Sequence, residues 1–250
     1  GGEATAFGTA ATAFGWQSNA RGERAHAMGH LANANGLRSL AVGEAANAVG
    51  EQASAIGNQA SATGVDATSF GTMANANGNS TTAVGGESNA DGLAATAFGW
   101  QSSATAERAH AFGHLASASG VRSTAVGEAA TADGLESIAL GNQSSADGAD
   151  AIAIGTMTTA SGPSTTVVGG ESTAMGPGAT AIGWRAMATA ERAQAFGHLA
   201  QATGVRSLAV GEGAVASGNT STAIGNLSSA GFGNSTAIGN GATTTRNNQI

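Results

Sequence analysis

The chain has 250 residues, of which 40 are Gly, 2 are Pro and none is Cys, and only 10% of its residues are charged. Aromatic residues, which supply much of the buried area of an ordinary core, make up 4%. The lack of Cys excludes a disulfide scaffold and a thiolate zinc site. The net charge of −7 argues against a nucleic acid or an anionic membrane as a partner. No apolar run is long enough to span a bilayer, and we expect no signal peptide at the N-terminus.

Gly recurs at every seventh position along the chain. From Gly8 to Gly239 a step of seven visits 34 positions, and Gly occupies 31 of them; the others are Ala106, Ala190 and Phe232. A helical heptad is excluded, because each Gly in a helix costs about 1 kcal/mol relative to Ala. Residues two and four positions before these sites are almost all Ala, Ser or Thr. This alternation predicts β-strands of about five residues joined by two-residue turns with Gly at their edge.

The repeating unit is two heptads long. The residue before the Gly position is large and apolar in every second heptad, and mostly small or polar in the heptads between. Two strands per 14 residues predict a narrow parallel β-solenoid, with the small side chains in its lumen and the large ones in an apolar row outside one sheet. Monomers rarely expose such a row, so we expect an obligate oligomer. The apolar row consists of Phe14, Met28, Val42, Ile56, Phe70, Val84, Phe98, Phe112, Val126, Leu140, Ile154, Val168, Ile182, Phe196, Val210, Ile224 and Ile238.

A longer repeat of 84 residues, or six turns, places a Trp, a His and a Glu on successive turns three times. We expect each set to stack in one column, as a ligand-binding ridge or as a ladder in which Trp covers His and Glu pairs with His. The three sets are Trp16, His30 and Glu44; Trp100, His114 and Glu128; and Trp184, His198 and Glu212.

Three further groups of polar residues have a structural and a functional interpretation. The predicted interface contains His26 and His110, with Gln194 at the equivalent position of the third repeat. These residues are interpreted either as hydrogen-bonding groups of the interface or as a metal or anion site on the oligomer axis. The pairs Glu23-Arg24, Glu107-Arg108 and Glu191-Arg192 are expected to start strands and to form salt bridges or a docking cluster. Asn19, Asn33 and Asn47 occupy the polar sheet, as a stabilising ladder or as a flat surface for an elongated ligand.

The strand sequence Asn234-Ser-Thr-Ala-Ile-Gly239, with its relatives at Ser221–Gly225 and Ser39–Gly43, resembles the head repeats of trimeric autotransporter adhesins of the YadA-like type. The resemblance covers about residues 4–240 and implies a left-handed parallel β-roll that assembles as a homotrimer. It implies a β-roll head over residues 1–240 and the start of a neck over 241–250.

The resemblance also implies a function. The expected function is that of a bacterial surface adhesin head that attaches to host cells or to an extracellular matrix protein of the collagen, fibronectin or laminin class, with bacterial self-association as a further role. The head would be held at the outer membrane through segments outside this sequence and would not itself contact a membrane.

No catalytic set, metal site or cofactor is expected, because the sequence has no motif that would supply one. The alternative function is that of an ice-binding or other structural solenoid. A regular Thr column would favour ice binding, but the positions that would form it are mixed, such as Asn19, Met187 and Val215.

Overall fold

The structure is a computed structural model that describes residues 2–250. Within these residues every regular element is a parallel β-strand of two or three residues, from β1 to β34. The chain contains two compact units, a first unit that ends at Ala125 and a second unit from Val126 to Ile250. Both repeat the same 14-residue pattern, in about 17 turns altogether. The predicted all-β parallel solenoid is therefore confirmed, whereas its left-handedness and the homotrimer stay predictions.

Two-residue strands alternate with three-residue strands in the first unit. The two-residue strands carry odd numbers: β1 (Thr5–Ala6), β3 (Asn19–Ala20), β5 (Asn33–Ala34), β7 (Asn47–Ala48), β9 (Ser61–Ala62), β11 (Asn75–Ala76), β13 (Asn89–Ala90), β15 (Ser103–Ala104) and β17 (Ser117–Ala118). The three-residue strands carry even numbers: β2 (Thr12–Phe14), β4 (His26–Met28), β6 (Leu40–Val42), β8 (Ser54–Ile56), β10 (Thr68–Phe70), β12 (Thr82–Val84), β14 (Thr96–Phe98) and β16 (His110–Phe112). One strand, β18 (Thr124–Val126), lies where the two units meet in the sequence.

The second unit has the same alternation. Its odd-numbered strands are β19 (Thr131–Ala132), β21 (Ser145–Ala146), β23 (Thr159–Ala160), β25 (Thr173–Ala174), β27 (Met187–Ala188), β29 (Gln201–Ala202), β31 (Val215–Ala216) and β33 (Ser229–Ala230). Its even-numbered strands are β20 (Ile138–Leu140), β22 (Ile152–Ile154), β24 (Thr166–Val168), β26 (Thr180–Ile182), β28 (Gln194–Phe196), β30 (Leu208–Val210), β32 (Thr222–Ile224) and β34 (Thr236–Ile238).

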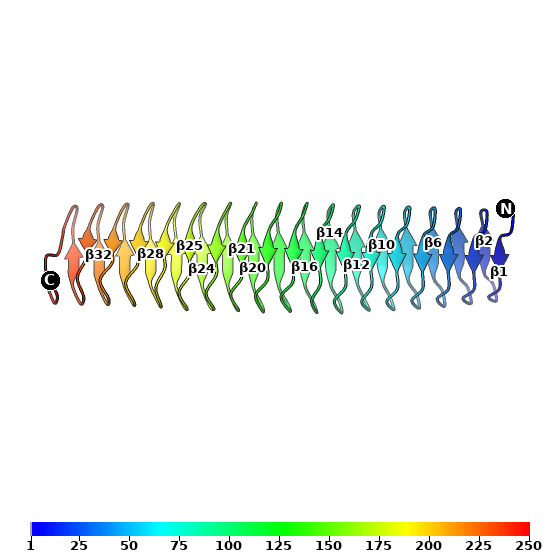
Figure 1. Cartoon of the computed structure of the whole chain (residues 1–250), viewed down its shortest axis with the longest axis horizontal. Coiled ribbons are helices and arrows are strands. Elements are labelled where there is room, and N and C mark those ends of the chain that lie inside the picture. Colours follow the sequence, from blue (N-terminus) through cyan, green and yellow to red (C-terminus); the bar gives the residue numbers. More distant parts are fainter. Residues whose placement is uncertain (1) are drawn as a thin grey trace. The chain divides into compact units, whose positions relative to one another are not determined.

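Each strand pairs with the strand two places along the chain, always in parallel and always with a register of 14 residues. Phe14 of β2 is opposite Met28 of β4, and Ala20 of β3 is opposite Ala34 of β5. Within each unit, even-numbered strands therefore form one sheet and odd-numbered strands form the other. Figure 1 shows the strands of each unit following one another in chain order. Equivalent residues of successive turns lie about 4.8 Å apart, so every side chain belongs to a column.

The lumen between the two sheets contains almost only Ala, Ser and Thr. Ala27, Ala34 and Ala41 have no exposed surface, and the largest fully buried side chain among residues 2–250 is Val167. Several luminal Ser hydroxyls donate a hydrogen bond to the carbonyl oxygen of the Gly three residues earlier, as Ser102 does to Gly99 at 3.0 Å. The predicted lumen of small side chains is confirmed.

The strands are shorter than the five residues predicted from the sequence, because the turns take up more of the chain. Each turn is closed by a backbone hydrogen bond over three residues, such as the one from Ala25 N to Gly22 O at 3.1 Å. Its third residue is left-handed, with φ of 56° at both Arg24 and Arg38. Sequence reasoning missed this position because the residues there are rarely Gly. Their backbone N–H groups donate to the preceding turn, Arg38 to Glu23 at 2.8 Å, which offsets the strain.

Gly is required for different reasons in the two kinds of turn. Turns that follow even-numbered strands have Gly with φ between 123° and 140°, as at Gly29, and an added Cβ would lie 2.4 Å from Gly43 O. In turns that follow odd-numbered strands the Gly lacks this positive φ, and its role is to let the backbones of successive turns approach closely. A Cβ added to Gly22 would lie 1.9 Å from Gly36 O. The three exceptions to the Gly period, Ala106, Ala190 and Phe232, all belong to the second kind.

The last residues continue the hydrogen bonding of the preceding turn. Asn234 Nδ2 donates to Asn248 Oδ1 at 2.8 Å, and Thr236 N donates to Gln249 O at 2.7 Å. The assignment of residues 241–250 to the start of a neck stays a prediction.

Candidate binding surfaces

The predicted column of Trp, His and Glu is present on the turns that follow the even-numbered strands, which we call the tryptophan edge. The ring of Trp16 stacks on His30 with centroids 5.0 Å apart and planes 27° apart. His30 Nδ1 lies 3.4 Å from Glu44 Oε1, and Asn58 Nδ2 donates to Glu44 Oε2 at 3.2 Å. Four successive turns thus form one chain of side-chain contacts in the first unit.

One face of the Trp16 ring is covered within the chain, by the ring of His30. The turn of Gly2 lies next to the ring as well, since a Cβ added to Gly2 would lie 3.2 Å from Trp16 Cδ1. The residue is still 49% exposed. Because a ligand such as a sugar ring stacks on an open aromatic face, this arrangement supports the interpretation as a ladder more than the interpretation as a ligand-binding ridge.

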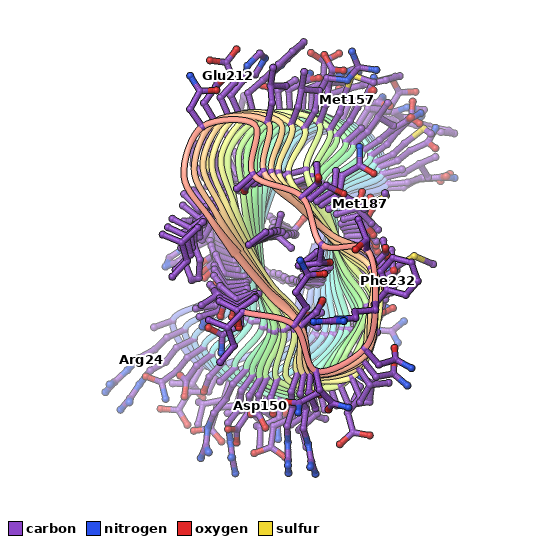
Figure 2. The ribbon with its side chains drawn as sticks, turned by 90° about the vertical axis from the view of Figure 1, so that its left-hand side faces the viewer. Arg24, Asp150, Met157, Met187, Glu212 and Phe232 are labelled. Atoms are coloured by element: carbon purple, nitrogen blue, oxygen red, sulfur yellow. The ribbon has the colours of Figure 1, made fainter. Side chains whose placement is uncertain are left out.

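The column recurs with the same ring geometry. The centroid distance is 5.0 Å for Trp100 and His114 and for Trp184 and His198. In the third copy Arg185 lies 5.0 Å from the centroid of the Trp184 ring and 3.4 Å from a carboxylate oxygen of Glu171. His198 lies 3.3 Å from Glu212, which is at the outer edge of the second unit in Figure 2.

The polar face of the first unit is an Asn ladder on the odd-numbered strands. Asn33 Nδ2 donates to Asn47 Oδ1 at 3.0 Å, and Asn75 Nδ2 donates to Asn89 Oδ1 at 3.2 Å. These side chains are half-buried and aligned in one column, with Asn19 opposite Asn33. The face is flat, because each side chain packs beside the same position of the next turn.

The corresponding face of the second unit is different, and sequence reasoning did not identify it as a site. Met187 and Val215 occupy the column there, and Figure 2 shows Met187 pointing away from the lumen. A shallow hollow of about 240 Å³ lies beside Met187 and is also lined by Glu171, Arg185 and Leu199. The sequence contained one signal for this change. The equivalent positions of the three 84-residue repeats are Asn19, Ser103 and Met187, so the third repeat has an apolar residue where the first two have polar ones.

The apolar row lies on the outer face of the even-numbered strands in each unit. No member of the row is buried; Phe14 is 68% exposed, and Phe70 and Phe98 are each 54% exposed. His26, His110 and Gln194 begin strands on this same face, and His110 lies 6.4 Å from the Phe112 ring. Among residues 2–250 no three His, Asp or Glu side chains are grouped so that they could hold a metal ion.

The Glu-Arg pairs lie in turns, contrary to the expectation that they start strands. They occupy the turns that follow the odd-numbered strands, and we call this row of turns the charged edge. The Arg of each pair is the left-handed third residue of its turn and therefore lies outside the strand. Arg24 Nε lies 3.7 Å from Glu23 Oε1, and both side chains are more than half exposed. Figure 2 shows Asp150 at this edge of the second unit, opposite Glu212 and Met157.

A parallel solenoid of 14-residue turns with a lumen of Ala, Ser and Thr defines the class of fold. The YadA head domain repeat family matches residues 1–18, 6–32, 20–43, 34–60, 62–88, 90–116, 118–144, 132–158, 146–179, 160–186, 174–200, 188–211, 202–228 and 233–248. The chain therefore belongs to this family and is a YadA-like head domain of a trimeric autotransporter adhesin, which confirms the resemblance seen in the sequence. The family is one of surface-exposed adhesins and not of enzymes. No curated protein matches the chain.

None of the regular elements in residues 2–250 is a helix that could cross a membrane.

Proposed function

We propose that this head domain assembles as a homotrimer at the bacterial surface and attaches the cell to a host extracellular matrix protein of the collagen, fibronectin or laminin class. Membership of an adhesin family supports the general role. The observation that supports the assembly is the apolar row, because it places one large apolar side chain on every turn of the even-numbered sheet and none of them is buried in the single chain.

The lumen cannot supply the burial that the apolar row lacks. It is filled by Ala, Ser and Thr, and its residues are already packed to zero exposure. Covering one Phe or Ile side chain contributes about 1.5–3 kcal/mol, and a row on every turn offers this gain repeatedly to a neighbouring copy. The same face of a second and a third copy would cover these side chains without any change of the fold.

The assembly is tested by sedimentation with a pair of matched variants. Phe98 in the row and Leu93 on the charged edge are 54% and 49% exposed in the single chain. Phe98→Ser is therefore expected to lower the thermal midpoint and the trimer fraction, whereas Leu93→Ser leaves both nearly unchanged. Equal effects of the two substitutions, or a wild-type chain that sediments as a monomer at micromolar concentration, would contradict the proposed interface.

The polar sheet is the proposed ligand surface, because it is flat, carries aligned amide groups and lies on the strands opposite the apolar row. An elongated partner can contact the same column on many turns and on three chains, which multiplies weak contacts. The direct test is binding of the wild-type trimer to immobilised collagen, fibronectin and laminin.

Asn47→Arg together with Asn75→Arg should lower the binding at least tenfold, whereas Ser80→Arg on the exposed charged edge should not. Binding that all variants retain would place the ligand elsewhere, and no binding to any of the three proteins would reject matrix attachment.

A further inference from the structure

The hollow beside Met187 on the second unit combines an apolar wall with polar groups at its rim. It has a volume of about 240 Å³ and lies where the tryptophan edge meets strands β25, β27 and β29. Met187 and Leu199 supply apolar surface, Thr173 and Gln201 lie beside them, and all four residues are half-buried. Sites that enclose a drug-sized molecule have volumes of about 300–1,000 Å³, so this hollow has room for one small ring.

The polar groups of the hollow are not used up by contacts within the chain. Arg185 is held at the rim, because its Nε lies 3.4 Å from Glu171 Oε2 and its Cζ lies 5.0 Å from the centroid of the Trp184 ring. Its terminal amino groups, like the side-chain groups of Thr173 and Gln201, form no hydrogen bond with any residue that the structure describes. The hollow therefore presents positioned donors and acceptors to a ligand.

The first two repeats lack this combination of groups. In the second repeat the residue equivalent to Arg185 is Gln101, whose amide donates to Glu87 at 2.6 Å. Ser103 stands there in place of Met187. The first repeat has the same contact between Gln and Glu and also a polar residue in place of Met187. The third repeat alone therefore joins an apolar wall to an arginine whose terminal groups are open.

The open groups are those that pair with the hydroxyl groups of a sugar. A hydroxyl group both donates and accepts, so neighbouring hydroxyls of one ring can accept from Arg185 and donate to Glu171. The half-buried amide of Gln201 offers a further donor and acceptor. Met187 and Leu199 then contact the C–H groups on the face of the ring, which gives the sugar an apolar surface to rest on.

Two other classes of ligand fit the hollow less well. The ladder of β27 is complete, because Met187 pairs with Thr173 of β25 and with Gln201 of β29, so the backbone of a peptide finds no open strand edge. An anion would approach Arg185 beside the carboxylate of Glu171, whose charge opposes it. The net charge of −7 adds to this repulsion.

We propose that this hollow binds one neutral hexose residue of a glycan. The site is complete in one chain, because all of its lining residues belong to the second unit, and its strands form the sheet opposite the apolar row. The inference therefore depends neither on trimer assembly nor on the matrix ligand. A single sugar in so shallow a site is held weakly, and a trimer with three hollows gains affinity for a glycan that repeats the sugar.

Methyl NMR of the wild-type protein, labelled at its methionine methyl groups, is the direct test. The chain has five Met, and the signal of Met187 is identified by its loss in Met187→Ser. The neutral probes are the methyl glycosides of glucose, galactose, mannose and N-acetylglucosamine. The methyl glycoside of glucuronic acid and a short acidic peptide represent the other classes. We expect at least one neutral glycoside to shift the Met187 signal until it saturates, while the signals of Met28 and Met73 in the first unit stay in place.

Further variants test which residues hold the sugar. Arg185→Gln should lower the affinity at least tenfold, whereas Met175→Ser, which replaces an exposed residue of the same sheet outside the hollow, should leave it unchanged. In the opposite direction, N89T/Q101R/S103M/S117Q gives the second repeat the lining of the third. The methyl signal added by this variant should then shift with the same glycoside. Circular dichroism checks that each variant is folded.

Glu171→Gln separates a neutral sugar from an acidic ligand, because loss of the repelling charge should strengthen the binding of an acid and not that of a neutral glycoside. The proposal is overturned if no neutral glycoside shifts the Met187 signal, if only the glucuronide or the peptide does, if Arg185→Gln binds like the wild type, or if the folded second-repeat variant gives no response. Sedimentation of the wild-type protein reports trimer assembly separately, so a failure of the proposed trimer is distinguishable from a failure of this site.

Discussion

Substitution of Gly by Ala should distinguish the two kinds of turn. At Gly141, which follows an even-numbered strand, φ is 136° and an added Cβ would lie 2.3 Å from Gly155 O. At Gly134, which follows an odd-numbered strand, the added Cβ would lie 2.0 Å from Gly148 O, but the backbone has no positive φ. Both changes overpack the turn, at about 1–3 kcal/mol, and only the first adds backbone strain, at about 1–3 kcal/mol. Gly141→Ala should therefore cost about 2–6 kcal/mol and Gly134→Ala about 1–3 kcal/mol.

The assay is guanidinium unfolding followed by far-ultraviolet circular dichroism, with the shift in midpoint as the measurement. Ala106→Gly serves as a control that removes a natural methyl group at a turn of the second kind, and its free energy of unfolding should change by less than about 1 kcal/mol. The reasoning is wrong if Gly134→Ala destabilises the chain as much as Gly141→Ala, because positive φ would then not be what reserves the first kind of turn for Gly.

Four further substitutions test the lumen and the tryptophan edge. Val167→Ala removes two buried methyl groups and should lower the unfolding free energy by about 1–3 kcal/mol, while Ala139→Val should lower it by a similar amount through overpacking, both measured by chemical unfolding. His198→Ala uncovers one face of the Trp184 ring. Because the ring is then in greater contact with water, the fluorescence emission of Trp184 should shift to longer wavelength, and an unchanged spectrum would contradict the stacking. Arg185→Gln, which restores the residue of the first two copies, should change the unfolding free energy by less than about 1 kcal/mol, since the ion pair to Glu171 is exposed.

The 14-residue period made the architecture predictable from the sequence. A strand exposes its alternate residues to opposite sides, so the small residues at Ala25 and Ala27 and the large residue at Met28 could each be assigned to a face. The column of Trp16 and His30 was predictable for the same reason, because residues 14 positions apart must meet in a stack of 14-residue turns.

The turn geometry was not predictable in the same way. The left-handed position is held by residues as different as Arg24, Leu31 and Asp66, so no residue type marks it. The backbone hydrogen bonds to the preceding turn make this conformation acceptable, and they depend on the complete stack. The hollow beside Met187 was also missed, because it arises from a local change in one copy of a repeat whose other copies carry polar residues.

The uniform lumen has a consequence for how the chain finds its register during folding. Ala27 packs beside Ala41 as Ala41 packs beside Ala55, so this luminal column is the same on the three turns, and a chain that skipped one of them would bury the same methyl groups there. Only the exterior distinguishes them, since Trp16 fits beside Gly2 and His30 but would meet a different pair of neighbours after a slip. The exposed side chains, more than the small luminal ones, thus determine which turn pairs with which and define the correct register of the stack.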